Sequence, residues 1–200
     1  MFPLPELLVP SLASTERLVA LPPLFLRDAV SGAVPRLRTA VRIGVRNGDL
    51  CVRFDGRDDG VVATLTERDA PLWREDVFEV FLSPEEPART YFEFEVNPLG
   101  ALFDARVESP SLGRDGMRVA TEWSCDGFSA RVAVRPGRWS ASIRIPLTPL
   151  CGKTRPERWR ANFYRVDRGA EDEYSAWSPT GVKPPDFHVP EKFGVLRMGG

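Results

Sequence analysis

The sequence predicts an all-β protein, built as an antiparallel β-sandwich. Three observations lead to this fold class. Many short runs alternate apolar and polar residues with a period of two. Turn-forming residues separate these runs at intervals of about 8–12 residues, which is typical of sandwiches. No ten-residue stretch carries a convincing helical stripe. The expected protein is therefore two packed sheets joined by turns.

The first elements follow from proline content and one strong turn. Residues 1–34 form a proline-rich segment that we expect to pack on the domain. Residues 18–26 predict one or two short edge strands, because the neighbouring prolines cannot donate to a central ladder. Residues 41–45 and 50–54 alternate on either side of Asn47-Gly48. Both turn residues tolerate positive φ, so this stretch predicts a hairpin.

The central pair of strands is expected at 77–82 and 91–97, joined by the proline-interrupted linker 83–90. Glu79 lies on one face of the first strand. The second strand presents an aromatic ring, two carboxylates and an amide on one face, namely Tyr91, Glu93, Glu95 and Asn97. A polar face beside an aromatic ring suits a sugar, whose hydroxyls need hydrogen-bond partners and whose C–H faces need a flat apolar surface. The alternative is a solvated sheet face.

The rest of the chain supplies the remaining strands. A single helical turn is expected at 147–150. No internal repeat, linker or composition break is visible, so the chain is interpreted as one domain spanning 1–200. Further strands are predicted at 101–107, 120–124, 128–134, 139–145, 160–166 and 195–198.

Composition excludes several classes of partner. A net charge of -1 gives no field that would attract nucleic acid or an anionic membrane. No apolar run reaches the roughly 20 residues that span a bilayer. Three widely spaced cysteines indicate neither a disulfide framework nor a zinc site. No secretory signal is visible, which predicts a cytoplasmic protein, or an extracellular one if a leader was removed. The oligomeric state is left open.

Five sequence blocks occur in one order: W-R-E-D-V-F-E-V-F-L-S-P, Y-F-E-F-E-V-N-P-L-G, W-R-A-N-F-Y-R, E-Y-S-A-W-S-P-T and D-F-H-V-P-E-K-F-G-V-L. Together they resemble the family 9 carbohydrate-binding modules over about residues 35–198. The resemblance implies a jelly-roll-like sandwich without catalytic machinery, often serving carbohydrate breakdown beside a glycoside hydrolase in bacteria. It also implies bound calcium, and two tryptophans that stack on opposite faces of a terminal sugar.

By this resemblance the stacking pair is Trp73 and Trp177, and Glu79 matches the glutamate of the V-F-E-V-F strand. Both tryptophans stand in proline-bounded, loop-like contexts, where an exposed ring needs something to cover it. The alternative is that either ring plugs the end of the sandwich. The other tryptophans lie in strand-like patterns and are expected in the core: Trp123, Trp139 and Trp159.

The predicted function is non-catalytic carbohydrate binding, with hydroxyls held by Glu79, Glu95, Asn97 and Tyr91. An alternative is glycoside hydrolysis by Glu79, Glu93 and Glu95, because residues two apart on a strand lie about 6.5–7 Å apart, near the spacing of an inverting glycosidase. Against hydrolysis, no apolar pocket that would raise one carboxyl pKa is apparent. A second group is expected to add donors or to pair with these acids: Arg160, Asn162 and Tyr164.

Two further sites are possible from residue chemistry. Asp55, Asp58 and Asp59 cluster on one glycine-flanked loop and are candidate calcium ligands, with a solvated turn as the alternative. His188 is the only histidine. Some related sandwiches bind haem through histidine or methionine, and Met117 and Met198 are available, but a structural histidine that fixes the C-terminal segment is the favoured interpretation.

Overall fold

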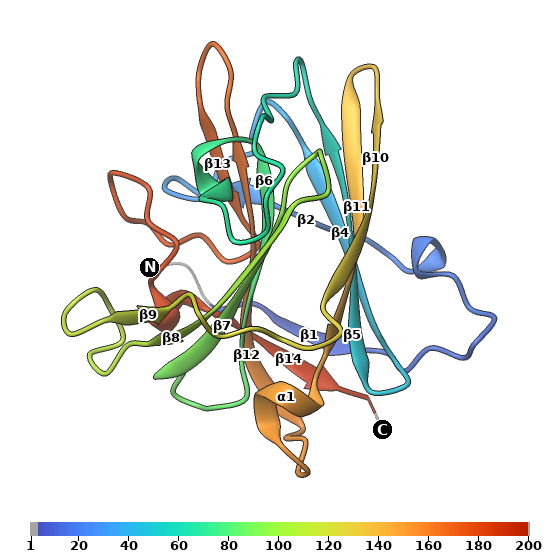
Figure 1. Cartoon of the computed structure of the whole chain (residues 1–200), viewed down its shortest axis with the longest axis vertical. Coiled ribbons are helices and arrows are strands. Elements are labelled where there is room, and N and C mark those ends of the chain that lie inside the picture. The colour runs from blue at the N-terminus through green and yellow to red at the C-terminus, as the bar shows by residue number, and fades with distance from the viewer. Residues whose placement is uncertain (1–3, 200) are drawn as a thin grey trace.

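The computed structural model describes residues 4–199 as two β-sheets packed face to face (Figure 1). The larger sheet has nine strands and the smaller has five. The larger runs β1 (Glu6–Val9), β14 (Gly194–Met198), β12 (Arg158–Asp167), β6 (Val77–Ser83), β7 (Thr90–Val96), β8 (Leu102–Glu108), β9 (Arg118–Ala120), with β13 (Glu173–Ala176) and β3 (Arg27–Asp28) beside β12. The smaller runs β10 (Ser129–Arg135), β11 (Arg138–Pro146), β5 (Asp49–Arg57), β4 (Thr39–Arg46), β2 (Leu24–Phe25). The predicted β-sandwich is confirmed.

Turn chemistry sets the register of the predicted hairpins. Asn47 and Gly48 have φ of 52° and 86°, and they join β4 to β5. β6 and β7 pair antiparallel with Glu79 opposite Glu95. Nearly all other pairs are antiparallel as well, but β1 runs parallel to β14. The sequence did not predict β1, because its four residues do not alternate long enough to reveal a strand.

Few helices occur, and all are short. The helical turn expected at 147–150 is α1 (Thr148–Cys151). Residues 18–26 hold η1 (Leu18–Ala20) and the edge strand β2 in place of two strands. The strand expected at 120–124 is β9, which ends at Ala120. Two more turns are η2 (Leu72–Arg74) and η3 (Pro190–Lys192). Within residues 4–199, no helix has the length and apolar character needed to cross a bilayer.

The main core lies between the sheets. Phe78 stacks on Trp139 with ring centroids 3.7 Å apart, and Phe54 stacks on the same Phe78 at 4.7 Å. Trp139 and Trp159 are buried, as expected, and Trp123 is half-buried against Phe92. Each fully buried aromatic side chain contributes roughly 2–3 kcal/mol to stability.

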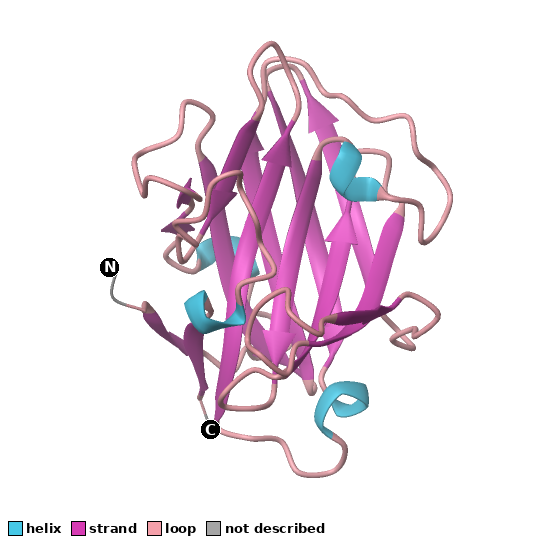
Figure 2. Cartoon of the chain, turned by 90° about the vertical axis from the view of Figure 1, so that its left-hand side faces the viewer, coloured by secondary structure: helices cyan, strands magenta, loops and turns pink. Residues whose placement is uncertain are grey.

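A second apolar cluster lies on the outer face of the nine-stranded sheet. Loops and η2 cover this face, as the turned view in Figure 2 shows. The cluster includes Leu72, Val77, Phe81, Phe103, Tyr164 and Phe187. Because both faces of the sheet are covered, every residue of β6 is buried. This double burial determines the character of the candidate site.

Candidate functional site

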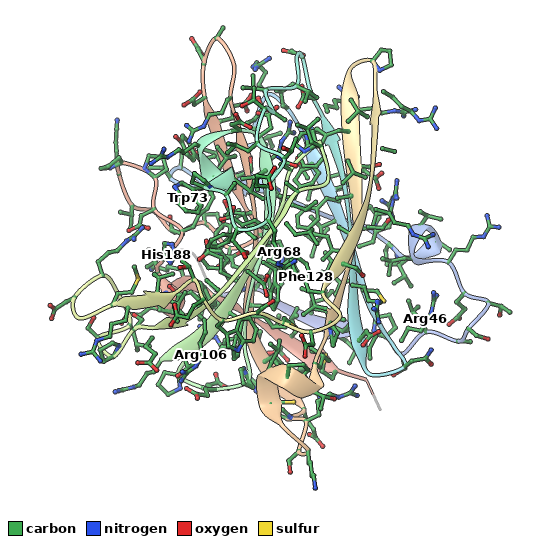
Figure 3. All side chains as sticks on the ribbon, viewed as in Figure 1. Arg46, Arg68, Trp73, Arg106, Phe128 and His188 are labelled. Atoms are coloured by element: carbon green, nitrogen blue, oxygen red, sulfur yellow. The ribbon has the colours of Figure 1, made fainter. Side chains whose placement is uncertain are left out.

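A cleft of about 530 Å³ opens on the outer face of the nine-stranded sheet. This volume is within the range of small-molecule sites. Figure 3 shows two residues of its walls, Trp73 and His188, on the same side of the sheet. Glu79 and Glu93 form the floor from β6 and β7. The walls are completed by Phe103, Arg114, Val119, Thr121, Val166, Arg168, Tyr174, Pro185, Asp186 and Phe187.

Three buried glutamates meet at this floor. Glu79, Glu93 and Glu95 are 2%, 5% and 0% exposed, and one carboxylate oxygen of each lies within 4.8 Å of the others. The expected solvated face is therefore wrong: the alternation was correct, but loops cover the polar side as well. Such a cluster cannot hold three negative charges in a medium of low dielectric constant without protons or cations.

The glutamate pKa values follow from this crowding. Burial raises the pKa of Glu93 to about 7. Burial, and then the neighbouring glutamate charges, raise the pKa values of Glu79 and Glu95 well above the ordinary value of 4.5. The apolar environment that the sequence did not reveal is thus present. Because the three carboxyls interact strongly, they titrate as one coupled group.

Hydrogen-bonding capacity remains unused in this cluster. Within residues 4–199, Glu79 Oε1 and both carboxylate oxygens of Glu95 are buried without a hydrogen-bond partner. The backbone N–H of Trp73 lies near Glu95 but does not reach hydrogen-bond geometry. Buried polar groups left unpaired cost roughly 1–3 kcal/mol each. Glu79 lines the cleft, and its unpaired Oε1 is shielded from solvent.

Trp73 forms the aromatic wall of the cleft. It belongs to η2, and its ring stands edge-on to Phe103 at 5.3 Å with an interplanar angle of 74°. The side chain remains 42% exposed although apolar residues surround its base. An indole ring that is held by an aromatic neighbour and is still 42% exposed is suited to stacking against a flat ligand.

Trp177 does not reach this cleft, which corrects the predicted tryptophan pair. Its ring packs from the other side of the sheet, against the core between the sheets and 5.5 Å from Phe163. Gly194 leaves the space for it, because a Cβ at that position would lie 2.6 Å from the indole ring. Residues alternate across a strand, and Tyr174 and Ala176 of β13 face the outer cluster. Trp177 therefore points inward.

Arg168 and Tyr174 form the wall next to Trp73. The Arg168 guanidinium lies 5.2 Å from the Tyr174 ring and donates to the Trp73 carbonyl at 2.9 Å. Its Nη1 also bonds the Tyr174 hydroxyl and Asp172. Its Nε is buried and has no partner among the described residues. Arg168 therefore lines the cleft while most of its hydrogen-bonding capacity is used within the protein.

His188 and Arg114 form the opposite wall. Tyr91 is buried beneath the cleft, and its hydroxyl lies 2.7 Å from His188 Nδ1. Burial lowers the pKa of His188 to about 4, so the ring is neutral at pH 7. Arg114 forms a two-pronged ion pair with Asp186, which also accepts the His188 backbone N–H at 3.0 Å. Tyr91 therefore supports the wall rather than facing a ligand.

The haem interpretation loses one of its possible ligands. Met198 is buried in the core between the sheets. Met117 lies nearer, with its sulfur 3.8 Å from the Tyr91 hydroxyl. His188 fixes the C-terminal segment through its contact with Tyr91, as the favoured interpretation expected.

Other predicted site residues have structural roles. Asn97 closes the turn after β7: its side chain donates to the Leu65 carbonyl at 2.7 Å and accepts from the backbone of Leu99 and Ala101. Asn162 bonds both backbone groups of Ser178. Two further hydrogen bonds join β12 to the C-terminal segment, from Arg160 to Phe193 and from Tyr164 to Phe187. The prediction that Asn97 contacts a sugar is therefore corrected, and Arg160, Asn162 and Tyr164, which were expected to add donors or to pair with the glutamates, bond backbone groups of the C-terminal part of the chain.

The predicted calcium aspartates separate in space. Asp55 pairs with Arg42 and Arg53 on the smaller sheet, and Asp59 pairs with Arg36 at the surface. Asp58 instead joins Asp76 and Asp167, and carboxylate oxygens of the three lie within 4.8 Å of one another. These three are buried around Arg165, which bonds Asp58 and Asp167.

Several cleft residues gave no signal in the sequence. Arg168 and Arg114 are two of many arginines, and nothing near them marks a pocket. Phe187 and Asp186 come from a loop far from β6 and β7 in the chain. Only the D-F-H-V-P block, which contains both, hinted at them. Their convergence is a long-range property that local patterns do not report.

A family model described as "Carbohydrate-binding family 9" matches residues 31–198. The match covers well over half of the chain. The protein therefore belongs to carbohydrate-binding family 9, a family of non-catalytic carbohydrate-binding modules.

Individual relatives are more distant. A protein from Bacteroides uniformis, provisionally assigned as carbohydrate-binding, is similar with a TM-score of 0.75 and 20% identity, over 97% of this chain and 99% of that one. A family 9 module from Caldicellulosiruptor kristjanssonii in complex with cellotriose has a TM-score of 0.67 and 13% identity, over 98% of this chain and 94% of that one. The same kind of module in complex with glucose has a TM-score of 0.64 and 12% identity, over 98% of this chain and 96% of that one.

A curated fungal relative, named "Extracellular protein" and from Arthroderma benhamiae, is 28% identical over 145 residues, or 66% of this chain. The match covers 64% of the relative's own length.

Proposed function

We propose that this protein binds the end of a carbohydrate chain in the cleft on the outer face of its nine-stranded sheet. The sugar ring stacks on the open face of Trp73. Its hydroxyls donate to Glu79 and Glu93 and accept from Arg168. Trp73 alone thus provides the stacking surface that was predicted for two tryptophans. Tyr174 and His188 line other walls of the cleft.

One observation carries the proposal: an indole that is 42% exposed lines the same cleft as two buried glutamates and the Arg168 guanidinium. Glu79 Oε1 and Arg168 Nε are both buried without protein partners. A sugar hydroxyl is both donor and acceptor, so it is matched to a cleft lined by carboxyl groups and a guanidinium. An apolar ligand would leave them unpaired, which disfavours it.

The comparisons support the class of ligand. The related modules from Caldicellulosiruptor kristjanssonii are in complex with cellotriose and glucose, so gluco-configured sugars are the first probes to use. The name of the fungal relative supports an extracellular setting, where a carbohydrate-binding module meets polysaccharides beside secreted hydrolases.

Isothermal titration with cellotriose and glucose tests the proposal. Loss of the Trp73 stacking surface removes about 1–3 kcal/mol, so Trp73→Ala should weaken binding roughly tenfold to a hundredfold. Phe25→Ala is the matched control, because Phe25 is an aromatic ring with 52% exposure on the other sheet. Equal affinity in wild type and Trp73→Ala would refute this assignment of the site.

Calcium is a separate proposal. We propose that the ion implied by the family resemblance binds at Asp58, Asp76 and Asp167. With Arg165, these carboxylates carry a formal charge of -2 when all are ionised, which a divalent cation neutralises. Burial raises the pKa of Asp167 to about 7, as expected for uncompensated negative charge. The residues lie at strand ends and loops, where hard cations find carboxylate and carbonyl oxygens.

A further inference from the structure

The smaller sheet has an outward face that the proposed sugar cleft does not use. Its four longest strands are β4, β5, β10 and β11, and alternate residues of each point away from the core. Figure 1 shows β10 and β11 on the side of the molecule away from β6 and β7. We call the outward positions of these four strands the arginine face. Its arginines are Arg42, Arg46, Arg53, Arg57, Arg131, Arg135, Arg138 and Arg144.

Charge is strongly unbalanced on this face. Eight arginines stand against two acids, Asp49 and Asp55, which leaves a formal excess of six positive charges. The net charge of the whole chain is only -1. The near-zero net charge therefore conceals a basic surface. The expectation that the protein would not attract polyanions was based on the net charge of the whole chain and not on how the charges are distributed.

Half of these arginines already have partners. Arg42 and Arg53 share Asp55, and Arg144 pairs with Asp49 at 2.7 Å. Arg46 bonds the Glu16 carbonyl, where the N-terminal segment crosses this end of the sheet. These contacts have a structural purpose and leave little capacity for a ligand.

The other half are exposed and unpaired. Arg57, Arg131, Arg135 and Arg138 make no side-chain hydrogen bond or ion pair with any residue in the range 4–199. Arg135 lies directly opposite Arg138, and Arg138 lies directly opposite Arg57. Like charges at facing cross-strand positions destabilise a sheet. Three guanidinium groups in one row, without an acid between them, therefore cost stability in the isolated chain.

Edge protection does not account for the row. Charged residues do discourage pairing on edge strands, and β10 is the edge of this sheet. Arg57, however, belongs to β5, which lies between β11 and β4. A charge in an interior strand protects no edge. The row instead lines a hollow of about 420 Å³, together with Ala133 and with Asp55, whose charge is neutralised by Arg42 and Arg53.

We propose that the arginine face is a second binding surface, and that its partner is an acidic polysaccharide. Guanidinium forks bind carboxylate and sulfate groups through two parallel hydrogen bonds. Neighbouring strands place arginines about 4.8 Å apart, a spacing comparable with the length of one sugar ring. A polyuronate carries one carboxylate on each ring, so successive charges meet successive arginines.

The neutral residues of the face favour a glycan over other polyanions. Between the arginines lie mainly small side chains, among them Ala40, Ser140 and Ser142. The outward positions of these four strands hold no aromatic residue, and an exposed ring, Phe25 of β2, borders the face opposite Ala40. Proteins that bind single-stranded nucleic acid stack bases on aromatic rings, and membrane-surface segments insert large apolar ones. A hollow with a floor of small residues instead leaves room for a stiff chain to lie across it.

The test is titration with polygalacturonate, with dextran sulfate as the sulfated probe and duplex DNA as the competing polyanion. We expect wild type to bind at least one of the two glycans, with affinity that falls as salt rises from 50 to 200 mM. The triple variant Arg57→Gln/Arg135→Gln/Arg138→Gln should bind about tenfold more weakly, because exposed pairs contribute little individually.

The matched control removes the same charge elsewhere. Arg27→Gln/Arg89→Gln/Arg155→Gln changes three exposed arginines outside the face and should bind like wild type. Trp73→Ala should also retain polygalacturonate binding, which separates this surface from the sugar cleft. Equal losses in the two triple variants, no glycan binding by wild type, or tighter binding to duplex DNA than to either glycan would each overturn the proposal.

Discussion

Trp73 and Trp177 lie on opposite faces of the same nine-stranded sheet. Trp73 stands over the outer face beside Phe103, whereas Trp177 points into the core beside Phe163. One sugar cannot contact both rings, because the sheet separates them. The relation assigns Trp73 to binding and Trp177 to stability, and the two roles predict different mutant phenotypes.

Trp177→Ala should therefore destabilise the protein without removing its sugar site. Loss of a largely buried indole costs about 3 kcal/mol, which corresponds to a fall in Tm of roughly 6–12 °C. Thermal unfolding measures the loss, and titration with cellotriose well below Tm measures the retained affinity. A variant with unchanged Tm and lost binding would reverse the assignment.

Glu93 should make stability fall as pH rises. Its pKa in the folded state is about 7, against an ordinary value of 4.5. Between these pH values the folded protein holds a proton that the unfolded chain has released, so the free energy of unfolding decreases through this window. The stabilising contribution is complete below about pH 4.5 and is lost above pH 7.

Glu93→Gln keeps the shape and removes this titration. The variant should exceed wild type in Tm by about 3–10 °C at pH 8, with the difference disappearing at pH 4. Glu122→Gln, at an exposed position, is the control for the loss of one carboxylate. A constant Tm difference across the pH range would contradict burial of the Glu93 carboxyl.

His188 should titrate far below an ordinary histidine. Burial lowers its pKa from 6.5 to about 4, so its contribution to stability is present above pH 6.5 and is lost as pH falls toward 4. Because the chain has one histidine, its NMR ring signals need no assignment. A titration midpoint near pH 6.5 would place the ring in solvent.

Tyr91→Phe should destabilise the fold by about 1–2 kcal/mol, because it leaves Nδ1 of His188 unpaired.

Calcium, if bound at the buried aspartates, should raise Tm. A ligand at a hundredfold excess over Kd stabilises by about 2.7 kcal/mol, or roughly 5–10 °C here. Asp167→Asn should reduce this calcium-dependent rise, while Asp59→Asn, at the surface, should leave it intact. An identical melting curve with calcium and with excess chelator would show that calcium does not bind at these aspartates.

Local sequence patterns predicted the strands, and which residues share a strand face, better than they predicted whether each face is buried. The alternation around Glu79, Glu93 and Glu95 placed all three correctly on one face. It did not reveal burial, because the covering loops come from distant parts of the chain. Trp177 was misplaced for a related reason: its proline-bounded context resembles an exposed loop, but Gly194, seventeen residues later, makes room for it in the core.

The proposed sugar site places the ligand on Trp73 in the outer cleft. The most direct measurement is titration of the five tryptophan indole N–H signals by NMR with cellotriose and glucose. Trp73→Phe assigns the Trp73 signal by its disappearance. The account predicts that saturating sugar shifts the Trp73 signal and leaves that of Trp177 nearly unmoved. A shift at Trp177 without one at Trp73, or no shift with either sugar, would contradict it.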